Sequence, residues 1–508
     1  MPDSLAKLLR LIPSGTTEGE LGFLSEVFVL PAELREILSI PQGNPRLLVG
    51  RKGTGKTAIL EYLHLRLAER GIPSVLLRPD DLPLPNDEFK SVGDAKRRAY
   101  AELVLATASA VGKYTTFAKT DAERSLLLAA KQRGERGDDL IEKACKMLIP
   151  VGALLADIDF GAWIQDAAVT EHGLVTALRD VLSKETGRFV FVLVDDVDQI
   201  GRADTSDYTT RIWGLLLAIR KLASENRAIR AIVALRSEVW MRLEWDGIGG
   251  RDQVDHFLPL IHRLSPEQAD VERIVLGRLR AADPPGDLTQ FFEGADVRLP
   301  GSHETRKWMD FLAKNSRGRP RDALQLVRQL AARAISRRSP RITSVDVEAE
   351  ISGYSRKRVD LLSEEFAFDC PVLQDLIRSF QSLAFVESSQ HVFDHLQKLP
   401  SQFSVSLRGA VIQPGQRSHV FKLWRFLHET GFINAVVSDD RMPRGFRHIN
   451  YADDPELASA SRWNDIQPVA WEIHPVFRQF LIDEQTASAA DMGLSPEELR
   501  RQRRPSKT

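Results

Sequence analysis

The stretch LLVGRKGTGKTAIL, residues 47–60, places three glycines, three basic residues and two threonines between two apolar runs. The eight residues from Gly50 to Thr57 read GRKGTGKT and satisfy the pattern G-x-x-x-x-G-K-[ST]. The preceding RLLVG predicts a short buried strand, and KTAILEYLHLRLAERG predicts an amphipathic helix that ends at Gly71. The flanking strand and helix favour a phosphate-binding loop over a glycine-rich turn that matches by chance.

Such a loop binds phosphate through backbone N–H groups that point inward. Gly50, Gly53 and Gly55 let the backbone curl closely and adopt positive φ. The helix expected to begin at about Lys56 turns its unpaired N–H groups and the positive end of its dipole toward the phosphates. Lys56 would reach the β- and γ-phosphates, and the hydroxyl of Thr57 would bind Mg²⁺. The nucleotide-binding residues predicted in this segment are Gly50, Gly53, Thr54, Gly55, Lys56, Thr57 and Ala58.

An acidic motif follows a second apolar run, in RFVFVLVDDVDQIG. The residues from Val190 to Val194 are apolar on both faces, which is typical of a central parallel strand covered by helices. Asp195 is placed to bind Mg²⁺, directly or through water. Asp196 could accept a proton from an attacking water; Asp198 competes for this role, and adjacency favours Asp196. The alternative is that these acids only cap the strand.

The order of the expected elements predicts the fold class. IPSVLLRPDD predicts a second strand, TTRIWGLLLAIRKLASE a helix, and RAIRAIVALRSEVW a strand that ends at Arg236. This succession predicts an α/β fold with a parallel sheet and helices on both faces. Residues 86–185 are expected to form a mostly helical insertion between early strands.

The later chain is predicted to be helical and then mixed. Ser265, Pro266 and Gln268 predict a capped helix start, GRPRDALQLVRQLAARAISRR a second helix, and ITSVDVEAEISG a third, short one. A helix in SHVFKLWRFLHET, a stop at Gly431 and two strands predict a winged-helix domain. The expected boundaries are 1–44 for an irregular lead-in, 45–264 for the core with its insertion, 265–350 for the helical segment, 351–485 for the winged-helix-like domain and 486–508 for a polar tail.

Length and composition limit the class of protein. A chain of 508 residues is too long for one ordinary domain, so two to four are expected. The formal charge of −1 predicts no polyanion partner for the molecule as a whole. Cys145 and Cys370 are the only cysteines, which favours a reducing compartment. No signal peptide is visible, and acids and a proline interrupt the longest apolar stretch, so we expect a soluble cytoplasmic protein without a membrane partner.

The segments GRKGTGKT and FVLVDDVDQ together resemble the P-loop ATPases that carry an extra strand between the two motif strands. IVALRSEVW would supply that strand, and the resemblance implies that Arg236 senses the γ-phosphate. The alternative is that Arg236 pairs with Glu238 or another acid. The second acid here is Asp196 rather than the usual glutamate, which puts the hydrolysis rate in doubt. No arginine finger can be assigned among Arg211, Arg220 and Arg251.

NSRGRPRDALQLVRQLAARA resembles the lid helix of AAA+ ATPases of the origin-recognition type. The resemblance implies a helical lid at 265–350, in which Arg321 contacts the γ-phosphate. The same segment resembles the G-x-P signature of signal-transducing STAND ATPases, which implies that Pro320 belongs to the cofactor-binding set. The chain is similar to bacterial P-loop ATPases that share GRKGTGK and LRSE-type segments.

These features predict an enzyme, an ATPase that uses ATP and Mg²⁺ as a conformational switch. Lys56, Asp196, Arg236 and Arg321 would be its catalytic residues, and Thr57 and Asp195 its metal ligands. A protein partner or homo-oligomer is expected, and family analogy suggests bacterial signalling or defence.

Two alternatives stay open. One is an ATP-gated DNA-binding protein that uses Arg441, Arg444 and Arg447 on the wing, a prediction that the neighbouring Asp439 and Asp440 weaken. The other is a small-molecule kinase, which the lid and the winged helix disfavour.

Overall fold

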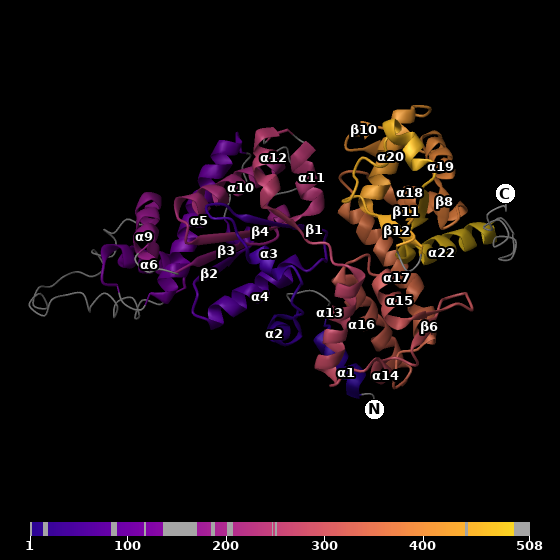
Figure 1. The fold of residues 1–508 in the computed structure, drawn as a ribbon, viewed down its shortest axis with the longest axis horizontal. Helices are drawn as coiled ribbons and strands as arrows, with labels where there is room; N and C mark the ends of the chain where they lie inside the picture. The colour runs from indigo at the N-terminus through magenta and orange to yellow at the C-terminus, as the bar shows by residue number, and fades with distance from the viewer. Residues whose placement is uncertain are drawn as a thin grey trace, which may run out of the picture. The chain divides into compact units, whose positions relative to one another are not determined.

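The computed structural model describes residues 3–13, 19–82, 89–115, 118–135, 170–183, 188–200, 207–245, 247–248, 251–441 and 445–491. The chain forms two compact units (Figure 1). We call Ser14–Gly277 with Arg319–Arg321 the sheet unit, and Met1–Pro13, Arg278–Gly318 and Asp322–Thr508 the C-terminal unit.

The sheet unit is built on a five-stranded sheet in the order β2-β3-β4-β1-β5, with all pairs parallel. The strand β4 lies between β1 and β3, which confirms the extra strand expected between the two motif strands. The α/β fold with a parallel sheet is therefore confirmed. The strands are β1 (Arg46–Gly50), β2 (Ser74–Leu77), β3 (Val190–Val194), β4 (Ile229–Arg236) and β5 (Ile261–Arg263).

The register of the strands sets which residues meet at the carboxyl edge of the sheet. Gly50, the last residue of β1, is the partner of Arg236, the last residue of β4. Val194, the last residue of β3, is the partner of Val233, so β4 continues beyond the end of β3. Since parallel strands end at one edge, the segments that follow β1, β3 and β4 gather there.

Helices cover both faces of the sheet, as the fold class predicts (Figure 1). On one face, Leu48 of β1 and Ile232 of β4 pack with α3 (Leu34–Leu38) and α4 (Lys56–Glu69). On the other face, the alternate strand residues Val49, Val192 and Val233 share a core with two long helices. These are α5 (Val92–Tyr114) and α10 (Tyr208–Glu225).

The insertion between β2 and β3 packs through small residues. It contains α5, α6 (Asp121–Gln132) and α9 (Glu171–Ser183). A Cβ at Gly214 of α10 would lie 2.4 Å from the Cβ of Ala95 in α5, and one at Gly112 of α5 would lie 2.0 Å from the carbonyl oxygen of Leu126 in α6. The absence of a side chain at these two glycines therefore allows the helices to approach closely.

The lead-in is more regular than the sequence analysis expects. It contains α1 (Asp3–Leu11), which groups with the C-terminal unit, and α2 (Leu24–Val27) and α3, which group with the sheet unit. Two further helices of the sheet unit follow β4, namely α11 (Ser237–Trp245) and α12 (Arg251–Phe257).

Helices dominate the chain from α13 onward, with two differences from the sequence analysis. The helix α13 begins at Gln268, not beside Ser265, and the carboxylate of Asp270 accepts the backbone N–H of Glu267 (2.9 Å). The third helix continues through Gly353. The elements are α13 (Gln268–Ala282), α14 (Leu288–Phe291), α15 (Trp308–Lys314), α16 (Pro320–Ser336), α17 (Ser344–Glu365), α18 (Leu373–Ser379), α19 (Ser389–Gln402), α20 (Arg417–Thr430), α21 (Trp463–Ile466) and α22 (Pro475–Asp491).

A four-stranded antiparallel sheet lies in the C-terminal unit, in the order β12-β11-β13-β8. The helix α20 ends at Gly431, whose φ is 71°. The hairpin of β11 and β12 follows it, and β13 inserts between β11 and β8. The strands are β8 (Val386–Ser388), β11 (Ile433–Ser438), β12 (Phe446–Ile449) and β13 (Ala470–Ile473); β6 (Asp296–Arg298) with β7 (Thr305–Lys307), and β9 (Ser406–Leu407) with β10 (Ala410–Val411), form two small hairpins.

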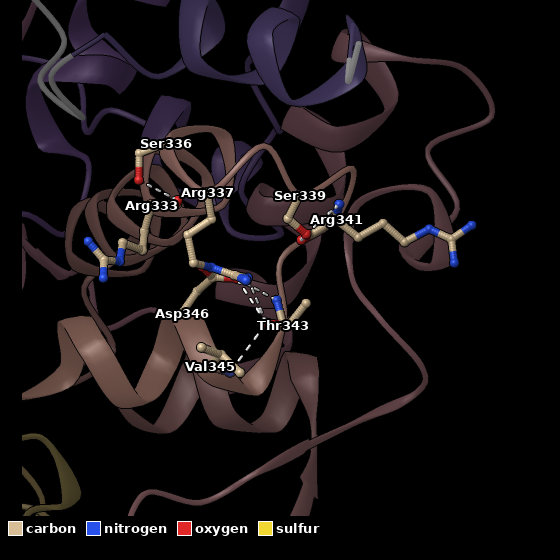
Figure 2. A network of polar contacts seen from close by, with 8 residues as sticks. All are labelled: Arg333, Ser336, Arg337, Ser339, Arg341, Thr343, Val345 and Asp346. Carbon is tan, nitrogen blue, oxygen red and sulfur yellow. Dashed lines mark hydrogen bonds and ion pairs between the residues drawn. The ribbon is translucent and has the colours of Figure 1, made fainter.

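One polar network joins two helices of the C-terminal unit (Figure 2). Thr343 caps α17, and its hydroxyl accepts the backbone N–H of Val345 (3.2 Å). Arg337, just after α16, donates from Nε and Nη2 to the two carboxylate oxygens of Asp346 in the first turn of α17, both at 2.8 Å. This network therefore ties the end of α16 to the start of α17.

Within the part of the chain that the structure describes, no helix combines the length and apolarity needed to cross a membrane.

Candidate functional site

The loop after β1 has the backbone geometry of a tight cradle. Gly53 and Gly55 have φ of 85° and 101°, a region in which a side chain is strained. Gly50 is needed for a different reason, since a Cβ there would lie 2.8 Å from Oγ1 of Thr54 and 2.9 Å from the carbonyl oxygen of Leu264. The helix α4 begins immediately after Gly55, so its first N–H groups lie at the loop.

Lys56 is the buried cation of this loop, with a residue exposure of 9%. Its Nζ donates to the carbonyl oxygens of Gly50 (2.7 Å) and Arg51 (3.1 Å). Burial lowers the pKa of the Lys56 ammonium, and among its charged neighbours Glu238 opposes this shift most strongly. Asp198 and Asp195 also raise this pKa, whereas Arg236 lowers it. Residues from the ends of β3 and β4 therefore act electrostatically on Lys56.

The other predicted residues of the loop lie beside Lys56. Thr54 is buried, and its hydroxyl donates to the carbonyl oxygen of Arg51 (2.9 Å). Thr57 and Ala58, in the first turn of α4, are half-buried. The hydroxyl of Thr57 lowers the pKa of the Asp195 carboxyl, so the two predicted metal ligands lie near each other.

Asp195 is a buried carboxylate with unusual surroundings. The residue is 1% exposed, and no donor among the described residues meets hydrogen-bond geometry at either of its side-chain oxygens. Burial is the largest effect that raises its pKa to about 6, and the charge of Asp196 adds to it. The Thr57 hydroxyl, the backbone N–H of Asp196 and the Lys56 ammonium only partly offset this rise. A carboxylate in this position would be stabilised by a cation.

The donor set around Asp195 fits Mg²⁺. Carboxylate and hydroxyl oxygens are hard ligands, and Mg²⁺ commonly binds with few protein groups, several waters and substrate phosphates. Among the described residues, no group of three or more His, Cys, Asp or Glu side chains could hold a metal ion. Asp195 and Thr57 would therefore hold Mg²⁺ together with phosphate oxygens rather than in a protein cage.

Asp196 has a left-handed backbone, with φ of 48° and ψ of 36°. It caps the short 3-10 helix η4 (Val197–Gln199), and its carbonyl oxygen accepts the backbone N–H of Gln199 (2.8 Å). Its side chain is half-buried. The chain thus turns sharply after the metal-ligand position, and Asp196 stays accessible to water at the same edge of the sheet.

Arg236 forms an ion pair at the end of β4. Its Nε lies 3.0 Å from Oδ2 of Asp198, and the two side chains are 23% and 9% exposed. An ion pair with Glu238 or another acid was the alternative to a γ-phosphate contact for Arg236. In the structure the acid is Asp198. Burial raises the pKa of Asp198, and the charge of Arg236 lowers it.

Glu238 also belongs to the charged group around Lys56. It was not predicted from the sequence as a residue of the nucleotide site. It lies in the first turn of α11, two residues after the end of β4, and its charge acts on Lys56. Its sequence position two residues after Arg236 was the signal that could have placed it there.

Arg319–Arg321 group with the sheet unit although the chain on both sides of them belongs to the other unit. The Cβ atoms of Arg321 and Arg319 lie 3.4 and 3.6 Å from the position that a Cβ on Gly53 would take. The backbone N–H of Arg321 donates to the carbonyl oxygen of Gly53 at 3.4 Å. Pro320 is buried and is the first residue of α16. The predicted lid residues therefore lie beside the loop.

Two of the three arginine-finger candidates have contacts within the sheet unit. Arg211 is buried, and its Nε donates to Oδ2 of Asp207 (2.6 Å). Arg220 lies over the ring of Phe257, with its Cζ 5.6 Å from the ring centroid. Both side chains serve contacts inside the sheet unit, and the side chain of Arg251 lies outside the described residues.

The two described wing arginines, Arg441 and Arg447, differ in their contacts. Arg441 is exposed, whereas Nε of Arg447 lies 3.4 Å from Oδ2 of Asp439. Arg444 lies outside the described residues. The final eight residues of α20, from 423 to 430, are almost all buried, so this half of the helix is not a free surface.

Comparisons with known proteins cover the chain unevenly. Residues 271–363 match a family model described as the FunZ-associated C-terminal helical domain. An Escherichia coli (strain K12) protein named "Putative transposon gamma-delta 80.3 kDa protein" is 22% identical over 412 residues, which are 77% of this chain and 56% of that protein. The chain thus spans about half the length of this curated relative.

Two solved structures show weak similarity over most of the chain. The ORC2 protein of Aeropyrum pernix, solved as ADPNP and ADP complexes, has a TM-score of 0.37 and 10% identity, and the match covers 93% of this chain and 94% of that one. Cdc6p of Pyrobaculum aerophilum has a TM-score of 0.30 and 14% identity, covering 91% of this chain and 95% of that one. This level of similarity does not assign the chain to a family. The description of the fold therefore rests on the strand order of the chain's own sheet.

Proposed function

We propose that this protein binds ATP with Mg²⁺ at the carboxyl edge of its parallel sheet and hydrolyses it. The observation that carries the proposal is the Asp195 carboxylate, which is buried and accepts no hydrogen bond of normal geometry from the described residues, while the hydroxyl of Thr57 lies near enough to lower its pKa. A buried charge without a partner is costly, and a bound cation would offset that cost. The glycine loop and Lys56 lie at the same edge and suit a polyphosphate.

The residues of the loop and of α4 would bind the phosphates. Backbone N–H groups after Gly53 and at the start of α4 would donate to phosphate oxygens. Lys56 now donates to two carbonyl oxygens, and it would exchange them for the β- and γ-phosphates. Asp195 and Thr57 would hold Mg²⁺, which neutralises phosphate charge.

Asp196 would orient the attacking water and accept its proton. Its half-buried carboxylate directly follows the metal ligand, and its left-handed backbone turns it away from the strand direction. The carboxylate of Asp198 already bonds Arg236, which favours Asp196 for this role.

The helix α16 would transmit the state of the bound nucleotide to the rest of the chain. Arg321 would contact the γ-phosphate, and Pro320 would lie against the nucleotide, so both sense its state from the first turn of one helix. The helix α16 ends at Ser336, and the winged-helix-like region predicted at 351–485, which follows later in the chain, would bind a protein partner or a second copy of the chain. Signalling and defence are the settings that the sequence resemblance implies. The curated relative carries the word transposon in its name, so DNA is included as a ligand in the test below.

The test is nucleotide binding and turnover with Mg²⁺, with and without DNA, for wild type and three variants. Lys56→Ala should lose about 10- to 100-fold in nucleotide affinity, because it removes charge-assisted bonds to phosphate. Asp196→Asn should bind ATP normally and turn it over about 100-fold more slowly or worse. The matched control is Lys52→Ala, because Lys52 is an exposed lysine at a variable position of the same loop.

Two outcomes would contradict the proposal. Wild-type protein that binds no ATP in the presence of Mg²⁺ would exclude the site. Equal turnover in wild type and Asp196→Asn would remove Asp196 from the mechanism while leaving the binding site in place.

A further inference from the structure

The ion pair between Asp198 and Arg236 joins two neighbouring strands at the proposed site. Arg236 is the last residue of β4, and Asp198 lies in the 3-10 helix that follows β3. The pair is largely buried, with side-chain exposures of 9% for Asp198 and 23% for Arg236. It therefore differs from an exposed surface pair, which solvent and salt would weaken.

The position of the Asp198 carboxylate is determined by its backbone. The turn begins at Asp196 in the left-handed conformation, and the next residue, Val197, is fully buried. The hydroxyl of Tyr208 donates to the carbonyl oxygen of Asp198 at 3.0 Å. These features hold the backbone of the turn, and the ion pair with Arg236 holds the Asp198 carboxylate at the end of β4.

The contact with Asp198 uses the inner nitrogen of the Arg236 guanidinium. The 3.0 Å distance joins Oδ2 of Asp198 to Nε. A guanidinium has five N–H donors in a planar fork, so an ion pair whose closest contact is at Nε can orient the plane while the outer amino groups reach a second anion. Since Arg236 is the register partner of Gly50, this fork lies where the phosphate loop begins.

We propose that Asp198 is a positioning residue that orients Arg236 toward the terminal phosphate and so sets the preference for ATP over ADP. This inference rests on the proposed function of the site. ADP lacks the γ-phosphate, so loss of the orientation should affect ATP affinity and leave ADP affinity unchanged. A structural role alone would change both affinities or the thermal stability.

The experiment measures the affinities of the full chain for ADP and for a non-hydrolysable ATP analogue, both with Mg²⁺. Arg236→Gln should reduce the ratio of ATP-analogue affinity to ADP affinity about 10-fold, and Asp198→Ala should reduce it by a similar factor. In the Arg236→Gln background, Asp198→Ala should have no further effect, because the pair acts through one guanidinium. Asp198→Asn should restore part of the ratio, since its amide oxygen can still accept the Nε–H.

The matched control is Asp80→Ala, an exposed acid that follows β2 at the same edge of the sheet. Wild type that binds neither nucleotide would overturn the proposed function and this inference with it. Binding with an unchanged ratio in Asp198→Ala, additive effects in the double variant, or an equal loss of ADP affinity would overturn the inference alone.

Discussion

Asp195 in the sheet unit and Asp346 in the C-terminal unit are both buried, with exposures of 1% and 0%. The oxygens of Asp346 accept hydrogen bonds from Nε and Nη2 of Arg337 at 2.8 Å each (Figure 2). They also accept the backbone N–H of Thr343 (2.8 Å) and its hydroxyl (3.1 Å). Among the described residues, no such donor meets either oxygen of Asp195.

The difference separates a carboxylate that stabilises the fold from one that is available to a ligand. A buried acid whose oxygens all find donors ties elements together, as Asp346 does for α16 and α17. A buried acid whose oxygens accept no hydrogen bond of normal geometry, with a pKa raised to about 6, destabilises the fold unless something else binds it. Two other buried acids of the C-terminal unit each have an arginine partner; Asp322 pairs with Arg358, and Glu429 pairs with Arg408.

The largest expected change in the free energy of unfolding follows the replacement of Asp346, the acid whose oxygens all accept hydrogen bonds. Asp346→Ala leaves Arg337 and the cap of α17 without their shared acceptor. It should lower the free energy of unfolding by about 3 kcal/mol, because the Arg337 side chain is 31% exposed and regains water only in part. Urea unfolding of the full chain would measure this loss, and nucleotide affinity of the folded protein should be unchanged. A loss below about 1 kcal/mol would show that the network does not stabilise the fold.

Replacement of Asp195 is expected to change the free energy of unfolding in the opposite direction. Without nucleotide or Mg²⁺, Asp195→Asn should raise the free energy of unfolding by on the order of 1–3 kcal/mol above pH 7. The folded-state pKa of about 6 lies above the ordinary value, so the wild type loses stability as the pH rises from about 4 to about 6. The amide does not titrate, so the gain should vanish near pH 4.

Urea unfolding at several pH values would test this prediction for Asp195. Added Mg²⁺ and ATP should stabilise the wild type more than Asp195→Asn, which keeps the loop and Lys56 but lacks one metal ligand. A variant that is less stable than the wild type at pH 8 would contradict the comparison between the two acids.

A smaller effect is expected for the cap beside Asp346. Thr343→Ala removes the hydroxyl that accepts the backbone N–H of Val345, and N-cap losses cost about 1 kcal/mol. Thr343→Ser should retain most of the stability in the same unfolding measurement. Equal losses in both variants would point to the methyl group rather than the cap.

The smallest effect is expected for an exposed pair. Arg66 and Glu69 on α4 form an i,i+3 ion pair with side chains 45% and 52% exposed. Arg66→Ala should change the free energy of unfolding by less than about 0.5 kcal/mol, because water and salt screen the pair. A loss comparable to that of Asp346→Ala would show that burial is not what separates these interactions.

Some predictions failed because a local signal was overridden by contacts elsewhere. Gly353 was expected near the end of a short helix, yet α17 continues to Glu365. Residues of α17 after Gly353, including Tyr354 and Leu362, are buried. Their packing offsets the free-energy cost of one glycine in a helix. The helix α13 begins later than expected, at Gln268. The side chain of Asp270, not that of Ser265, accepts a backbone N–H at its start.

The sequence by itself determined the elements whose signals are local. The glycines, the buried strand before them and the helix after them predict the loop at Gly50–Thr57, and the run Val190–Val194 predicts the strand before Asp195. Periodicity and backbone preference act over a few residues, so one sequence can show them.

Only the tertiary structure decided which distant groups meet. It placed β13 between β11 and β8, joined Arg236 to Asp198, and left Asp195 without a donor among the described residues. Strand pairing and side-chain satisfaction depend on residues tens of positions apart, and many arrangements are compatible with the same local pattern. The burial of a charge and the identity of its partner are therefore properties of the folded chain.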